Sequence, residues 1–139
     1  MDYEEYELLV EQQRVKNNQL LDQFESHLKG EKLSEKTVSK HLNNLDFYVN
    51  HYLLHEEIIE PKNGGAEEIG YFFEGWFPRK AMWSSPESVK ATITVLKKFY
   101  QYLLSQGLVS ASQYSELLEI IKESKDEWVS YYQPMESGW

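Results

Sequence analysis

The sequence predicts an all-α protein, and three observations support this class. Apolar residues recur at three- and four-residue spacing along most of the chain, which is the period of an amphipathic helix. No stretch shows the apolar–polar alternation of a half-buried strand. Glycine and proline fall at a few places between the periodic stretches, where they mark joints. With 139 residues, we expect a single domain over 1–139, built as a bundle of four to five helices.

The first expected helix covers residues 3–29 and ends at Gly30 as its C-cap. Its inner stripe is Leu20, Leu21, Phe24 and Leu28. The second begins after Ser34, a good N-cap, has Glu35 in its first turn, and fades near His55. Its core face is formed by Val38, Leu42, Leu45, Val49, Tyr52 and Leu53. Pro61 and the Asn63-Gly64-Gly65 run predict the loop that follows.

The third expected helix, 66–77, is almost entirely apolar and should be central to the core, with Pro78 stopping it. Its core residues are Ile69, Phe72, Phe73, Trp76 and Phe77. The fourth is capped by Ser84 or Ser85, has Pro86 at its first position, and ends at Gly107. Its stripe is Val89, Ile93, Leu96, Tyr100 and Leu103.

A fifth helix begins near Ser110 or Ser112 and carries Tyr114, Leu117, Leu118, Ile120 and Ile121. An aromatic tail follows, which contains Trp128, Tyr131, Tyr132 and Trp139. The sequence leaves two alternatives open: the tail packs on the bundle, or it frays.

Composition narrows the class of protein. Hydrophobic residues make up 41 % of the chain and aromatics 14 %, which predicts a folded core. The absence of cysteine excludes disulfides, thiolate chemistry and cysteine-bound zinc. The acidic N-terminus lacks a signal-peptide pattern, and no apolar run approaches the roughly 18 residues of a membrane helix. We therefore expect a cytoplasmic protein without membrane contact.

The net charge of −9 argues against strong binding to nucleic acid, but the charges are unevenly distributed. Acidic residues dominate 1–11, 56–74 and 113–136, whereas most basic residues lie in 29–40 and 79–98. Because of this uneven distribution, DNA binding through the two basic stretches stays an open hypothesis.

Two segments of the chain carry a family resemblance. The first, 33–47, reads Leu33-Ser34-Glu35-Lys36-Thr37-Val38-Ser39-Lys40-His41-Leu42-Asn43-Asn44-Leu45-Asp46-Phe47, with a Ser-x-x-Thr start and a run of leucines. The second lies in 84–109 and contains Val95-Leu96-Lys97-Lys98-Phe99-Tyr100-Gln101-Tyr102-Leu103, followed by Gly107-Leu108-Val109. Together the two segments resemble the N-terminal core-binding domain, often called SAM-like, of tyrosine recombinases and phage integrases. The resemblance covers about 20–125, which leaves an N-terminal helical extension and the C-terminal tail outside it.

The resemblance implies a four- or five-helix bundle that closes one side of a clamp around duplex DNA. In that family, strand cleavage belongs to a separate C-terminal domain, which is missing here. The chain has two arginines, Arg14 and Arg79, and no His-x-x-Arg motif. We therefore expect no enzyme, no cofactor and no small-molecule substrate, but a free-standing relic or regulator from a mobile element. The tail from Pro134 to Trp139 shows no linker, which favours a complete protein over a piece of a longer recombinase.

The expected DNA-binding residues lie on the polar faces of the second and fourth helices, with a basic pair before the fourth. Lysines would contact phosphates, and Asn43 or Gln101 could reach a base edge. The set is Lys36, Lys40, Asn43, Asn44, Arg79, Lys80, Lys90, Thr94, Lys97, Lys98 and Gln101. The alternative interpretation of the same residues is the solvated face of two amphipathic helices.

Other candidate residues have structural interpretations. Phe47 lies on the polar face, where cover by the tail or a neighbouring helix is the first expectation. His51 and His55 have metal-ligand spacing but no third ligand, and we expect no metal. The glutamate pairs are expected to be solvated, and the serines at helix starts to act as caps. The rival function is an acidic helical module for protein–protein contact or dimerisation that has lost DNA binding.

Overall fold

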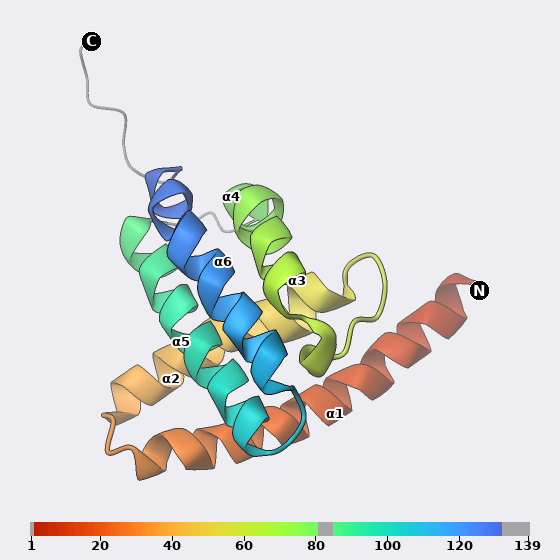
Figure 1. Ribbon diagram of the computed structural model, residues 1–139. Coiled ribbons are helices and arrows are strands. Elements are labelled where there is room, and N and C mark those ends of the chain that lie inside the picture. Colours follow the sequence, from red (N-terminus) through yellow and green to blue (C-terminus); the bar gives the residue numbers. More distant parts are fainter. Residues whose placement is uncertain (1, 81–84, 132–139) are drawn as a thin grey trace.

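The computed structural model describes residues 2–80 and 85–131, and these residues form helices and loops without a strand (Figure 1). The α-helices are α1 (Tyr3–Gly30), α2 (Glu35–Asp46), α3 (Ala66–Tyr71), α4 (Phe77–Lys80), α5 (Pro86–Ser105) and α6 (Ala111–Ser130). The all-α class is therefore confirmed. None of the helices in the described ranges is long and apolar enough to cross a membrane.

Short helical segments of other types extend the α-helices. The π-helical segment η1 (Phe47–His51) and the 3₁₀ turn η2 (Tyr52–Leu54) continue α2, so the run ends close to His55, as predicted. A second 3₁₀ turn, η3 (Pro61–Asn63), lies in the loop that follows. A second π-helical segment, η4 (Phe72–Trp76), joins α3 to α4.

Three serines begin the helices where the sequence placed caps. The Ser34 hydroxyl accepts a hydrogen bond from the Thr37 N–H at 3.1 Å. Ser85 and Ser110 each form a reciprocal capping box with the residue three positions later. Ser85 and Ser110 are therefore the caps of α5 and α6, whereas Ser84 lies outside the described residues.

The predicted C-terminal ends of the helices agree with the structure at α5 but not at α1. Gly107 has a φ of +75° after α5, and the Leu108 N–H bonds to the Leu103 carbonyl, as expected for a glycine-terminated helix. The prediction that Gly30 caps α1 is wrong, because Gly30 is still helical. The chain reverses at Lys32, which has a φ of +63°.

The prediction that Pro78 stops the third helix is also wrong. The helical run passes through Pro78 and continues to Lys80. A proline cannot donate to the carbonyl four residues earlier and crowds it. The wider π-helical turn η4 ends at Trp76, two residues before Pro78, and such turns change the register of the hydrogen bonds.

The helices pack around an aromatic core. α5 contacts both α2 and α6, α6 contacts α3, and α1 contacts α2. The largest fully buried side chains include Trp128, Tyr48, Tyr100, Phe24, Phe72, Phe73, Phe77 and Phe99. Trp128 stacks on Phe73 with 4.9 Å between ring centroids, so this part of the aromatic tail docks as the last turns of α6. Tyr131 is exposed, and Tyr132 and Trp139 lie outside the described residues.

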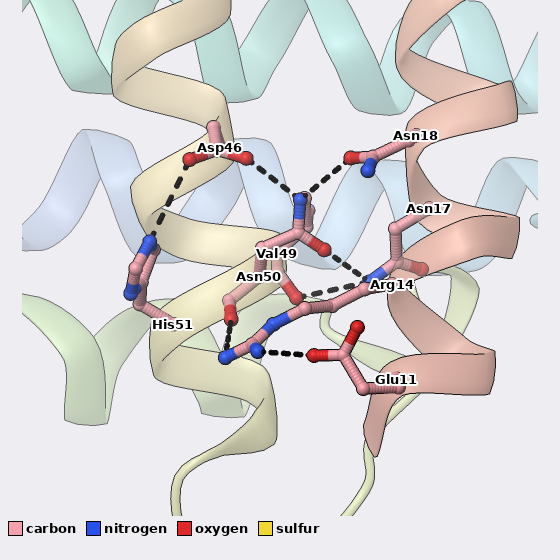
Figure 2. Close-up of polar contacts among 8 residues, drawn as sticks. All are labelled: Glu11, Arg14, Asn17, Asn18, Asp46, Val49, Asn50 and His51. Carbon is pink, nitrogen blue, oxygen red and sulfur yellow. Dashed lines mark hydrogen bonds and ion pairs between the residues drawn. The ribbon is translucent and has the colours of Figure 1, made fainter. Parts of the chain in front are cut away.

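A polar network holds α1 against η1 (Figure 2). The buried Asn17 side chain donates to the Val49 carbonyl at 3.1 Å and to Asn50 Oδ1 at 2.9 Å. Asn50 in turn donates to Asn18 and Asp46. The two amides therefore fix how α1 lies across the helical run that follows α2.

Candidate nucleic-acid interface and acidic cleft

The exposed side of α2 carries the first group of predicted DNA-binding residues. Lys36, Lys40 and Asn43 are exposed. With Ser39 and Asn44 they line a shallow depression of about 500 Å³. Ammonium groups, a hydroxyl and amide N–H groups are all donors, so the depression suits an anion.

The second group lies on α5, which packs against α2. Lys90, Thr94, Lys97 and Gln101 recur at three- and four-residue spacing and are all exposed, so they form one stripe. Glu87 is the single acidic residue in α5. Together α2 and α5 carry five lysines against three acidic residues, although the chain as a whole has a net charge of −9. We call the exposed sides of these two helices the lysine face, defined by Lys36, Lys40, Asn43, Lys90, Thr94, Lys97 and Gln101.

Lys98 is the exception among these lysines because it is already paired. Its ammonium lies 2.9 Å from a carboxylate oxygen of Glu31, in the turn after α1. This hydrogen bond lowers the pKa of Glu31, and His27 lies 3.3 Å from the other carboxylate oxygen. Glu31 therefore neutralises one charge at the edge of the lysine face.

Asn44 is largely buried, contrary to the prediction, although it contributes to the lining of the depression. Its side chain is 8 % exposed, and its Nδ2 has no hydrogen-bond partner among the described residues. His41 is also buried, and this burial, followed by the charge of Lys98, lowers its pKa. The sequence carried a signal for His41, because it falls between Val38 and Leu45 in the core stripe of α2.

The basic pair at the end of α4 makes other contacts. Arg79 Nε donates to the Gly75 carbonyl at 2.9 Å. The Lys80 ammonium lies 5.4 Å from the ring centre of Trp76. Neither contact joins these residues to the lysine face, and Arg79 instead lines a cleft among glutamates.

Phe47 is half-buried beneath a neighbouring helix, as expected. Its ring centroid lies 6.1 Å from that of Phe72 and 6.2 Å from that of Phe77. The α3–η4–α4 run therefore covers Phe47, and the ring contributes to packing.

The two histidines with metal-ligand spacing face different partners. His51 Nε2 lies 3.6 Å from Asp46, whereas the His55 ring packs on Trp76 with 4.2 Å between centroids. In the ranges that the structure describes, no three histidine, cysteine or acidic residues come together as metal ligands.

A feature that the sequence did not reveal is a cleft of about 480 Å³ between the end of η2 and the α3–η4–α4 run. We call it the acidic cleft. It is lined by Tyr52, His55, Glu56, Glu57, Ile59, Glu68, Tyr71, Glu74, Gly75, Trp76 and Arg79. Burial, and then the charges of Glu67 and Glu57, raise the pKa of Glu68. The glutamate pairs expected to be solvated thus include one carboxylate that is partly buried.

Comparisons of the chain with protein-family models, with curated proteins and with solved structures gave no match.

Proposed function

We propose that this chain binds duplex DNA without catalysis, through the lysine face formed by α2 and α5. The observation that carries the proposal is the presence of exposed lysines on two helices in contact, which carry only three of the 23 acidic residues of the chain. The resemblance of these same segments to a recombinase core-binding domain supports it. Lysines supply the phosphate contacts, and Asn43 and Gln101 are the exposed amides within reach of base edges.

The binding should be modest and strongly salt-dependent. Four exposed lysines on the lysine face, Lys36, Lys40, Lys90 and Lys97, correspond to a salt slope of roughly −3 to −4 on a log–log scale. Affinity should then fall by on the order of 100-fold between 50 and 200 mM salt. The acidic remainder of the molecule repels DNA, so binding is best measured at low salt.

The test is fluorescence anisotropy with a labelled random-sequence duplex at increasing salt. Lys36→Glu/Lys40→Glu/Lys97→Glu should abolish binding. The matched control, Lys16→Glu/Lys122→Glu/Lys125→Glu, changes net charge equally at exposed positions on α1 and α6 and should retain most of it. Absence of binding at low salt, or equal losses in both variants, would refute the proposal.

One observation favours the rival function, a helical module for protein contact or dimerisation. The N-terminal half of α1 extends past the rest of the bundle (Figure 1), and Leu8 and Val15, seven residues apart, are 60 % and 57 % exposed. If this surface pairs two copies, light scattering during gel filtration will give twice the monomer mass. Leu8→Ser/Val15→Ser would then return the protein to a monomer.

A further inference from the structure

The acidic cleft has an aromatic floor. The rings of Tyr52, His55 and Trp76 contact one another, with centroid distances of 5.3 Å between Tyr52 and His55, 4.2 Å between His55 and Trp76, and 5.7 Å between Tyr52 and Trp76. Aromatic faces attract cations because their π-systems are electron-rich. The Lys80 ammonium, 5.4 Å from the ring centre of Trp76, is an example within this chain.

The carboxylates around this floor outnumber the cations. Within the described residues, Glu57, Glu68 and Glu74 form no ion pair, and Glu56 pairs only with His55, which is charged only when protonated. Arg79 lines the cleft as well, and its Nε donates to the Gly75 carbonyl. One oxygen of Glu68 is buried without a hydrogen-bond partner in the described part of the chain. With four glutamates against Arg79, the lining of the cleft has an excess of negative charge.

Tyr52 supplies an independent sign of a ligand. Its side chain is 6 % exposed and lines the cleft, and its hydroxyl makes no hydrogen bond to any described residue. Among the other buried tyrosines, Tyr48 and Tyr100 donate to backbone carbonyls, whereas the Tyr102 hydroxyl has no partner among the described residues. What distinguishes Tyr52 is that it lines the cleft, where its unpaired hydroxyl is available to a ligand.

We propose that the acidic cleft binds an alkyl cation, with its ammonium or guanidinium head among the carboxylates and its alkyl arm against the Tyr52–His55–Trp76 floor. Glu56, Glu57, Glu68 and Glu74 neutralise the head, and the Tyr52 hydroxyl accepts a hydrogen bond from it. The cleft volume of about 480 Å³ is within the range of small-ligand sites. This site is independent of the proposed DNA binding, which uses other helices.

Such a cation could be a free polyamine or the side chain of a basic peptide, and two probes separate these sources. Spermidine and a lysine-rich hexapeptide are titrated separately into the ¹⁵N-labelled protein at constant ionic strength. The readout is the shift of the Trp76 indole N–H and of the backbone amides that line the cleft. Saturable shifts with either probe are expected, and the tighter probe identifies the source.

Three variants locate the binding. Glu56→Gln/Glu68→Gln should weaken it by roughly tenfold or more, because two charged acceptors are lost. Glu119→Gln/Glu123→Gln, an equal change of net charge at exposed positions on α6, should leave it unchanged. Tyr52→Phe should weaken it by roughly fivefold without lowering Tm, since the hydroxyl has no partner to lose in the free protein.

Two results would overturn the proposal. The first is the absence of saturable cleft shifts with both probes. The second is equal weakening in Glu56→Gln/Glu68→Gln and in Glu119→Gln/Glu123→Gln, which would reduce the effect to the attraction of any cation to an acidic protein.

Discussion

At the scale of single residues, two buried tyrosines hold the loop that contains η3. The Tyr48 hydroxyl donates to the Gly64 carbonyl at 2.7 Å. The Tyr100 hydroxyl lies within hydrogen-bond distance of the carbonyls of Pro61 and Gly64, at 2.7 and 2.6 Å. Gly64 allows this close approach, because a Cβ there would lie 2.9 Å from the Tyr100 oxygen and 2.8 Å from Leu53 Cδ1. The loop is therefore fixed by side chains from two different helical runs.

Tyr100→Phe should lower the free energy of unfolding by about 0.5 to 1.5 kcal/mol, because the hydroxyl's hydrogen bond to the loop is lost while the Pro61 carbonyl keeps the Gly64 N–H and the Gly64 carbonyl keeps the Tyr48 hydroxyl. Urea unfolding followed by circular dichroism measures the change. Tyr102→Phe serves as the control, since the Tyr102 hydroxyl makes no hydrogen bond in the described part of the chain, and its unfolding midpoint should stay close to that of the parent.

Glu68 gives a prediction of pH dependence. Burial and the neighbouring carboxylates raise its pKa in the folded protein, so its charged form is less favourable folded than unfolded. The resulting loss of stability is absent below the ordinary glutamate pKa, grows as pH rises through the raised pKa, and is complete above it. Glu68→Gln should therefore raise Tm at pH 7.

The rise in Tm of Glu68→Gln should disappear at acid pH, where Glu68 is protonated in both the folded and the unfolded chain. Calorimetry at several pH values measures this change. A gain of equal size at pH 4 and pH 7 would show that the substitution acts through packing and not through charge. Glu119→Gln, at an exposed position, should show no such pH dependence.

At the scale of elements, the contact between α1 and η1 depends on amides in place of apolar side chains. Asn17 is 1 % exposed and bonds to both the backbone and the side chain of the π-helical segment (Figure 2). Gln13, one turn earlier, donates to Asn17 Oδ1 at 2.9 Å. A buried amide network is stabilising only while every member has a partner. It specifies one register of α1 on η1, since a shift by one residue would leave these groups unpaired.

Asn17→Ala should therefore destabilise the protein by about 1 to 3 kcal/mol, because Asn50 Oδ1 loses its donor and Gln13 Nε2 loses its acceptor. Hydrogen exchange should quicken first in the N-terminal half of α1. Gln19→Ala, at an exposed position in the same helix, is the matched control and should leave exchange nearly unchanged. Equal effects of the two substitutions would show that the network contributes no more than helix propensity.

At the scale of the whole molecule, charge is segregated. α2 and α5 together carry five lysines against three acidic residues, whereas α1 carries six acidic residues and α6 carries five. A molecule with net charge −9 can present a basic surface to DNA only if its acidic residues lie elsewhere. The Glu31–Lys98 pair lies at the boundary between the two regions, which makes it the most informative position for a change of charge.

Glu31→Gln should strengthen DNA binding several-fold, because Lys98 is then free to contact a phosphate. The salt slope should steepen by about 0.9, the contribution of one further phosphate contact. Glu119→Gln alters net charge equally on α6 and should leave the slope unchanged. If both variants bind with the same slope, Lys98 makes no phosphate contact. This prediction rests on the proposed function.

The sequence by itself determined the helical class, the cap at Ser34, the cap of α5 to within Ser84 or Ser85, the cap of α6 to within Ser110 or Ser112, and the end of α5 at Gly107. These features depend on residues within one or two turns of each other, so local spacing encodes them. The tertiary structure alone decided that Asn44 is buried, that Lys98 meets Glu31 across 67 positions, and that the acidic cleft assembles from both sides of a loop. Those outcomes depend on how the helices cross, and the side chains that meet there are too far apart in the chain for any local pattern to pair them.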